Sequence, residues 1–164
     1  MIVAPKDSAP EKYRGAGVLV PNVKELAQLV NMSIEVSGWL PDAAEQLMSA
    51  LQMESLLVTR GAEGMSYFEW SEKSLRRVDI ATNARAVYDV TGAGDTVVSV
   101  FTLTLAAGAD RETAARMANV AGGIVVGKRG TASISVDEMQ ERLNENMDLL
   151  LAAGRMASAR EAAD

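Results

Sequence analysis

"YDVTGAGDTVVSVF", residues 88–101, places three small residues between two aspartates and then continues into an apolar run. A loop needs one glycine to turn, so Gly92 and Gly94 around Ala93 indicate backbone that must come close to something. We expect a helix to begin near Gly94, and the first N–H groups of a helix have no acceptor within it. These N–H groups and the helix dipole attract anions such as phosphate. The stretch therefore predicts an anion site, with Asp95 in the first helical turn beside it.

Asp95 is the candidate for chemistry at this site. A carboxylate beside a bound phosphate can accept the proton of a hydroxyl that attacks the phosphorus atom. Phosphoryl transfer needs little more than positioning, charge neutralisation and such a base. The alternative is a plain helix start, in which Asp95 only interacts favourably with the helix dipole. The short stretch alone leaves both interpretations open.

The composition narrows the class of protein. The chain has 164 residues, of which 48% are hydrophobic, which suits one domain with a core. A net charge of −6 without a basic stripe argues against nucleic-acid binding. Cysteine and histidine are both absent, which excludes disulfides, histidine triads and most zinc sites. Without a signal peptide or an apolar run of ~18 residues, we expect a cytoplasmic protein that does not span a membrane.

Strands and helices alternate along the chain. Apolar runs bounded by turn signals predict buried strands within residues 1–5, 15–22 and 55–59, and a hairpin over residues 65–81. The predicted helices cover residues 23–32, 42–53, 94–107, 111–126 and 136–151. This alternation predicts an α/β fold, whose ligands bind at the carboxyl ends of parallel strands.

Capping signals fix two of the helix starts. Asp42 with Glu45, and Ser135 with Glu138, have the spacing of a capping box. We expect one partial domain over residues 1–152 and a polar tail over residues 153–164.

Other motifs accompany the opening stretch in a fixed order. "PNVKE" contains Asn22-x-x-Glu25, and "VTRGAEG" contains Thr59-x-Gly61-x-x-Gly64. "ANVAGGIVVGKRGT" then supplies Asn119 and Gly123. Together with "DVTGAGDTV" these segments resemble the ribokinase-like carbohydrate kinases, or PfkB family, from about Met1 to about Leu143. Within that family, the match is best to the kinase domain of the bifunctional heptose 7-phosphate kinase/ADP-heptose synthases.

The resemblance implies a fold, a reaction and a catalytic group. The fold would be a three-layer α/β/α sandwich, here its carboxyl-terminal, ATP-binding half. The reaction would be phosphoryl transfer from ATP to the anomeric hydroxyl of heptose 7-phosphate or a related sugar. Asp95 would be the base, and the N–H groups of Gly92, Ala93 and Gly94 would hold the charge of the transferring phosphoryl group.

The resemblance also implies cofactor contacts. Asn22 and Glu25 would arrange the water shell of Mg²⁺, and Thr59 and Gly61, in the turn that Gly64 closes, would contact phosphate oxygens. Asn119 and Gly123 would lie near the adenine. Positions around a monovalent cation such as K⁺ match Asp89, Thr91, Val125, Lys128 and Gly130. Lys128 would either replace or repel that ion.

Each motif also has a purely structural explanation. Asn22 and Glu25 are an ideal N-cap pair, and residues 59–64 can be a simple turn. The glycine pair at 122–123 can serve close helix packing, and residues 128–129 can be a solvated helix end.

The chain departs from the family in length and at one position. Family kinases are about twice as long, and Ala4 stands where relatives have the Asp of an Asp-Pro-Lys sequence. Three hypotheses follow: a kinase half that works with a missing segment, a truncated nucleotide-binding module without kinase activity, or a remnant. A truncated sheet exposes an edge and an apolar face, so we expect self-association or pairing with an amino-terminal half.

Overall fold

The computed structural model describes residues 1–72, 74–130 and 132–147. Its sheet has five strands in the order β1-β2-β3-β4-β5. The strands are β1 (Ile2–Val3), β2 (Val18–Leu19), β3 (Ser55–Thr59), β4 (Met65–Ser71) and β5 (Ser74–Ile80). The first three run parallel, while β4 and β5 form the predicted antiparallel hairpin beside β3.

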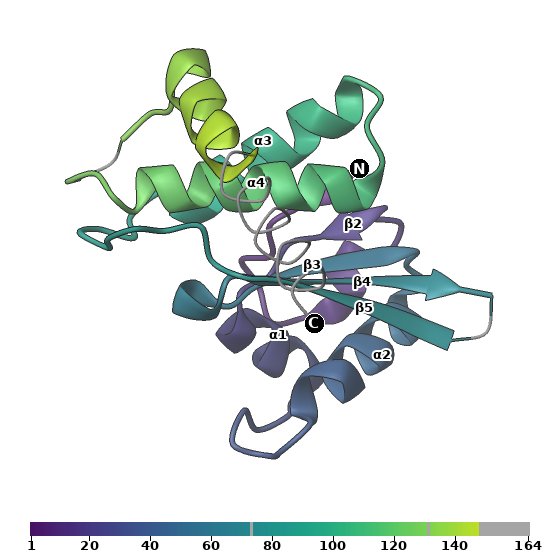
Figure 1. The fold of residues 1–164 in the computed structure, drawn as a ribbon. Coiled ribbons are helices and arrows are strands. Elements are labelled where there is room, and N and C mark those ends of the chain that lie inside the picture. Colours follow the sequence, from purple (N-terminus) through teal and green to yellow (C-terminus); the bar gives the residue numbers. More distant parts are fainter. Residues whose placement is uncertain (73, 131, 148–164) are drawn as a thin grey trace, which may run out of the picture.

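Helices cover both faces of this sheet. They are α1 (Val23–Val30), α2 (Trp39–Leu51), α3 (Ala93–Ala106) and α4 (Arg111–Val125), with short 3₁₀ turns η1 (Pro10–Tyr13) and η2 (Gly61–Glu63). Residues 136–147 form a further helix. Figure 1 shows α1 and α2 on one face of the sheet and α3 and α4 on the other. The predicted α/β/α layering is therefore confirmed.

The buried side chains form two cores, one on each face of the sheet. Successive side chains of a strand point to opposite faces. Leu56 and Val58 of β3 accordingly pack toward α1 and α2, whereas Leu57 packs toward α3 and α4. The apolar run of β3 is thus explained by helices on both sides, as expected for an interior strand.

The start of α2 differs from the sequence prediction. The helix begins at Trp39, after Gly38 in the left-handed conformation (φ 77°), and no side chain caps it. The capping box predicted from Asp42 and Glu45 is therefore wrong, because both residues already lie inside the helix. The other predicted box is confirmed, since Ser135 and Glu138 exchange backbone and side-chain hydrogen bonds.

The loops that carry the predicted motifs gather at one edge of the sheet. The carboxyl ends of β2 and β3 meet there, because Asn22 pairs with Thr59 across a parallel bridge. In Figure 1 the start of α3 and the end of α4 reach the same side of the molecule. Residues 148–151 of the last predicted helix and the tail over residues 153–164 lie outside the described residues. Among the helices that the structure describes, none is long and apolar enough to cross a membrane.

Candidate phosphoryl-transfer site

The start of α3 forms the centre of the site. Gly92 precedes the helix in the left-handed conformation (φ 79°), which glycine adopts without steric cost. Its carbonyl accepts hydrogen bonds from the N–H and the hydroxyl of Thr96, at 3.1 and 3.2 Å. The helix therefore begins at Ala93, one residue before the predicted start, and Asp95 lies in its first turn as expected.

The three expected anion donors are not equivalent. The N–H of Ala93 donates to the carbonyl of Val90 at 3.2 Å, so this donor is already engaged. Within the described part of the chain, the N–H groups of Gly92 and Gly94 donate to no protein acceptor. A Cβ at Gly94 would meet no atom within 4 Å. Protein packing therefore does not require glycine at 94, and the open space there can admit an anion close to the backbone.

Asn22 and Glu25 form a complete capping box at the start of α1. The Asn22 side-chain oxygen accepts from the N–H groups of Lys24 and Glu25 at 2.9 and 3.0 Å. The Glu25 carboxylate accepts from the Asn22 N–H at 2.8 Å. Asn22 is exposed and lies beside Thr59 at the strand ends, and Glu25 is partly exposed. The structural role of this pair is thus confirmed, and one Glu25 oxygen stays available to a hydrated cation.

The turn after β3 is held by its own backbone. The Arg60 N–H donates to the Gly64 carbonyl at 2.8 Å, and Gly61 has a φ of 59°. Gly64 has a φ of 85°, and a Cβ there would lie 2.1 Å from the Ile80 carbonyl oxygen. Gly64 is therefore required by the close approach of β5. Gly61 has open space around its Cα, which suits its expected place beside a phosphate.

Asn119 and Gly123 support the segment after β5. The Asn119 side-chain amide is 6% exposed and donates to the Ala81 carbonyl at 2.7 Å. A Cβ at Gly123 would lie 2.7 Å from the carbonyl carbon of Asn83. Both α4 residues therefore fix the backbone of residues 81–84. This arrangement shapes the wall of the neighbouring cavity, and the Asn119 amide is already committed to Ala81.

The five positions expected around a monovalent cation lie in the loop before α3 and in the end of α4 with the turn that follows it, and these two segments are in contact. The N–H groups of Tyr88 and Asp89 donate to the Val126 carbonyl at 2.8 and 3.3 Å. The Asp89 carboxylate accepts from the Thr91 N–H at 2.8 Å. Hydrogen bonds from Thr91 hold the pKa of the Asp89 carboxyl below its ordinary value, and the N–H of Gly130 adds to this effect. Val125 is buried just before the turn. Asp89 thus remains an anion that ties the two segments together.

The contacts of the Lys128 side chain differ from those that its motif suggests. Its ammonium donates to the Ser133 carbonyl at 2.8 Å and pairs with Glu138 at 2.5 Å. The neighbouring Lys128 ammonium and the Ser135 N–H lower the pKa of Glu138 to about 2. Lys128 is therefore a link between the turn after α4 and the helix of residues 136–147, whereas its neighbour Arg129 is exposed.

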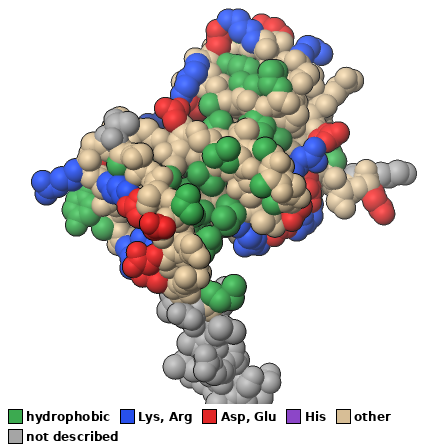
Figure 2. All heavy atoms as spheres, turned by 90° about the horizontal axis from the view of Figure 1, so that it is seen from above, with side chains coloured by type: hydrophobic (Ala, Val, Ile, Leu, Met, Phe, Trp, Pro, Cys, Tyr) green, Lys and Arg blue, Asp and Glu red, His purple; other side chains and the backbone are tan. Residues whose placement is uncertain are grey.

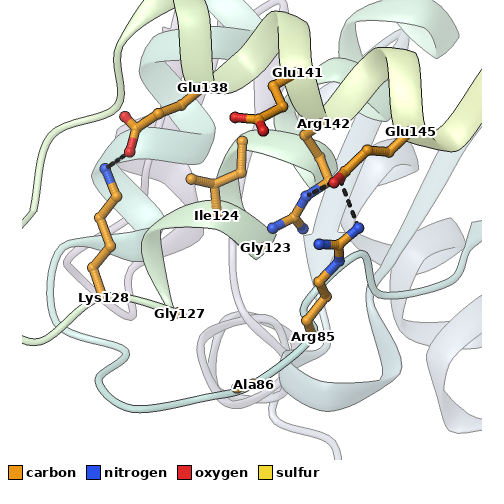
Figure 3. Close-up of a pocket in the computed structure, with 10 residues that line it drawn as sticks. All are labelled: Arg85, Ala86, Gly123, Ile124, Gly127, Lys128, Glu138, Glu141, Arg142 and Glu145. Atoms are coloured by element: carbon orange, nitrogen blue, oxygen red, sulfur yellow. Dashed lines mark hydrogen bonds and ion pairs between the residues drawn. The ribbon is translucent and has the colours of Figure 1, made fainter.

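A cavity of about 340 Å³ lies between this helix, the end of α4 and the segment after β5 (Figure 3). Its lining residues are Arg85, Ala86, Gly123, Ile124, Gly127, Lys128, Glu138, Glu141, Arg142 and Glu145. Arg85 pairs with Glu145 at 2.6 Å across the cavity, and Arg142 donates to the Asn83 carbonyl at 2.9 Å. The volume falls within the range of small-molecule sites.

The charged rim of this cavity is not evident from the sequence. Arg85 and Glu145 are 60 positions apart, and so no local pattern joins them. The capping box at Ser135 gives the start of the helix but not the surface to which it docks. Among the residues that the structure describes, no three acidic side chains cluster as a metal cage.

Comparison with known proteins agrees with this geometry. Residues 2–139 match the model of the pfkB family carbohydrate kinases. The bifunctional protein HldE of Geotalea uraniireducens (strain Rf4) is 50% identical over 139 residues, which are 85% of this chain and 28% of that protein. HldE of Desulfatibacillum aliphaticivorans is 43% identical over 145 residues, or 88% of this chain and 29% of that protein. The chain thus spans less than a third of the length of these relatives.

Solved structures show the same fold. Arabidopsis thaliana ribokinase, complexed with ribose and ATP, superposes with a TM-score of 0.76 at 24% identity, over 87% of this chain and 46% of that one. Phosphofructokinase-2 from Escherichia coli, in complex with potassium, gives a TM-score of 0.75 at 26% identity, over 85% of this chain and 45% of that one. The family match covers residues 2–139, which are most of the chain. The chain belongs to the pfkB family of carbohydrate kinases.

Proposed function

We propose that this chain is the nucleotide-binding half of a sugar kinase, which transfers the terminal phosphoryl group of ATP to a sugar hydroxyl. The proposal rests on the geometry at the start of α3. There Asp95 is exposed beside the unengaged N–H groups of Gly92 and Gly94. A base and an anion site on one helical turn are the parts that phosphoryl transfer requires.

The motif residues at the carboxyl ends of β2 and β3 and at the start of α3 each have a role in this proposal. Asp95 accepts the proton of the attacking hydroxyl, and the N–H groups of Gly92 and Gly94 hold the phosphoryl oxygens. Thr59 and Gly61 contact the phosphates from the turn after β3. Magnesium bound with ATP neutralises phosphate charge, and the free oxygen of Glu25 orients its water shell.

The cavity beside α4 suits the base and ribose of the nucleotide. It opens between the segment fixed by Gly123 and the helix of residues 136–147, next to the loop that leads into α3. For K⁺, the carboxylate of Asp89 and the backbone of the two segments offer oxygen ligands. Lys128 does not enter this set, because its ammonium is held by Ser133 and Glu138.

The proposed acceptor is heptose 7-phosphate or a related sugar phosphate. The 50% identity to an HldE protein supports this choice of subfamily. Because the chain spans 28% of that protein, contacts to the sugar are assigned to a partner amino-terminal half. We place the reaction in the cytoplasm, where ATP is available.

The first test is calorimetric titration of the full chain with ATP and magnesium, with Asp95→Asn as the matched variant. We expect both proteins to bind with dissociation constants within about threefold of each other, because Asp95 serves the transfer step. Absence of binding in both would contradict the assignment of a nucleotide site to this chain.

The second test measures transfer. The chain is mixed with the segment of the Geotalea protein that precedes the matched part, and phosphorylation of heptose 7-phosphate is followed. We expect Asp95→Asn to lower turnover by at least about 10²-fold, the usual contribution of a general base. ATP binding without any transfer would favour the alternative, a nucleotide-binding module without kinase activity.

A further inference from the structure

Arg60 lies between Thr59 and Gly61, the two residues to which the proposed function assigns contacts with phosphate oxygens. Many charged side chains of the protein lie in the open, as Figure 2 shows around the margin of the face that α3 and α4 form. The Arg60 side chain is only 19% exposed, whereas the next three residues, 61–63, are all exposed. Arg60 is therefore the residue that can fasten this part of the turn to the protein.

The guanidinium of Arg60 contacts the hairpin of β4 and β5. Its Nη1 donates to the Ser66 hydroxyl oxygen at 3.2 Å and to Asp79 Oδ1 at 3.3 Å. The Ser66 hydroxyl donates to the same Asp79 oxygen at 2.5 Å. Ser66 is fully buried and lies directly opposite Asp79 in the register of the two strands. The hairpin thus presents a hydroxyl and a carboxylate together, and the buried hydroxyl needs partners such as these.

The other side of the guanidinium is joined to the turn itself. Nη2 of Arg60 pairs with the Glu63 carboxylate. The Glu63 N–H donates to the Arg60 carbonyl at 3.2 Å, and the Gly64 N–H donates to the Gly61 carbonyl at 3.1 Å. The Glu63 side chain is 70% exposed, so this ion pair contributes little by itself. The contact with the hairpin is therefore the stronger anchor of the turn.

An arginine beside a phosphate site would ordinarily be expected to bind the phosphate itself. In this chain both terminal nitrogens of Arg60 already have carboxylate partners, Asp79 and Glu63. A second cation, Arg77, donates to the same Asp79 oxygen at 2.8 Å from its place on β5. The geometry therefore favours a role for Arg60 in holding the turn rather than in contacting the nucleotide.

We infer that Arg60 is a positioning residue for the phosphates of ATP. It acts through Ser66 and Asp79, which fix the turn between β3 and β4 against the hairpin. The turn then presents Thr59 and the backbone of Gly61 at a fixed place. This inference deepens the proposed function, on which it rests, and adds a residue that acts without touching ATP.

The first test compares ATP with adenosine, which has the same base and ribose but no phosphate. Both are titrated by calorimetry into the full chain and into Arg60→Gln. We expect Arg60→Gln to weaken ATP binding at least about tenfold, because a small misplacement of a positioned group is costly, and to change adenosine binding by less than about twofold. A general loss of structure would instead weaken both ligands equally, which would overturn the inference.

Arg77→Gln is the matched control. It removes the same charge from the same Asp79 oxygen but leaves the turn attached through Arg60. We expect its ATP affinity to equal that of the parent chain. Equal losses in Arg60→Gln and Arg77→Gln would show that only the charge near Asp79 matters, and would overturn the inference.

Asp79→Asn distinguishes positioning from direct contact by the sign of its effect. If Arg60 acts through the hairpin, loss of the Asp79 carboxylate loosens the turn and ATP binding becomes weaker. If Arg60 itself binds phosphate, its release from Asp79 makes ATP binding tighter or leaves it unchanged. Either of the latter two results would overturn the inference.

Hydrogen exchange without any ligand tests the anchor independently of ATP. Arg60→Gln should speed exchange of the Glu63 and Gly64 N–H groups at least about fivefold, because their turn opens more easily, whereas Arg77→Gln should not. Unchanged exchange in Arg60→Gln would overturn the inference. Faster exchange in a chain whose parent fails to bind ATP would support the anchor and contradict the proposed function alone.

Circular dichroism and thermal melting establish that each variant folds like the parent chain. Where Arg60→Gln does not fold, Arg60→Lys replaces it, because lysine keeps the charge but lacks the planar fork that reaches the hairpin and the turn together. The expected results for ATP, adenosine and hydrogen exchange stay the same in direction.

Discussion

Gly92 and Gly94 are two positions apart in the sequence and are glycine for different reasons. Gly92 has a positive φ that a side chain would strain, whereas Gly94 has helical backbone with open space around it. We expect Gly92→Ala to lower the free energy of unfolding by about 1–2 kcal/mol. Gly94→Ala should leave it unchanged or raise it by up to about 1 kcal/mol, because alanine is the better helix former. Urea unfolding of both variants checks this difference.

Gly94→Ala also distinguishes an effect on folding from an effect on ATP binding. A methyl group at residue 94 would occupy the space through which an anion approaches the backbone. Gly94→Ala should therefore weaken ATP binding at least about tenfold, although it folds as well as the parent chain. Equal ATP affinities of the parent chain and Gly94→Ala in calorimetry would contradict the placement of the phosphates at this turn.

Asn22 caps α1, and the contribution of this cap to stability can be measured. Its side chain accepts two backbone hydrogen bonds at the start of α1. Asn22→Ala should cost about 1 kcal/mol of stability. Lys24→Ala, an exposed neighbour in the same turn, is the matched control and should stay within about 0.5 kcal/mol. A loss of the same size in both would mean that the capping box contributes nothing specific.

At the scale of elements, the turn between β3 and β4 depends on Gly64. A Cβ would lie 2.1 Å from the Ile80 carbonyl, and backbone atoms there cannot move without displacing β5. We expect Gly64→Ala to cost on the order of 3 kcal/mol, from strain at a positive φ together with overpacking. Gly61→Ala shares the positive φ but has no contact, and should cost only about 1–2 kcal/mol. Chemical unfolding of both variants compares the two costs.

The ion pair that links the helix of residues 136–147 to Lys128 should be lost in acid. The pKa of Glu138 is about 2 in the folded chain, against an ordinary value of 4.5. A lowered pKa contributes stability that is fully present above pH 4.5 and is lost as the pH falls through 2. NMR of residues 136–147 should show the Lys128–Glu138 pair intact at pH 5 and lost near pH 2. Lys128→Met should move the titration of Glu138 to higher pH, and an unchanged midpoint would contradict the role of the ion pair.

At the scale of the whole molecule, the sequence was informative wherever a signal is local. The apolar run of β3, the alternation of strands and helices, and the capping boxes at Asn22 and Ser135 could all be read from neighbouring residues. Contacts between distant segments could not. The bond from Asn119 to Ala81 joins positions 38 apart.

The start of α2 shows how local signals can also compete. Asp42 and Glu45 have the right spacing for a cap, but Gly38 turns the chain four residues before Asp42, and Trp39 packs against the core. The charged rim of the cavity could not be predicted from the sequence, for a further reason. Ion pairs such as Arg85 with Glu145 depend on how a helix docks, which no periodicity in the sequence encodes.

The unequal lengths of the strand pairs have a consequence for the order of folding. β4 and β5 share seven paired positions and are adjacent in sequence, whereas β1 and β2 share two and are separated by a loop. Closing that loop costs chain entropy, and the two paired positions of β1 and β2 offset little of this cost. The hairpin should therefore form early and β1 late. In native-state hydrogen exchange we expect β1 to open at a lower free energy than β4. β1 would then be the last strand of the sheet to become ordered.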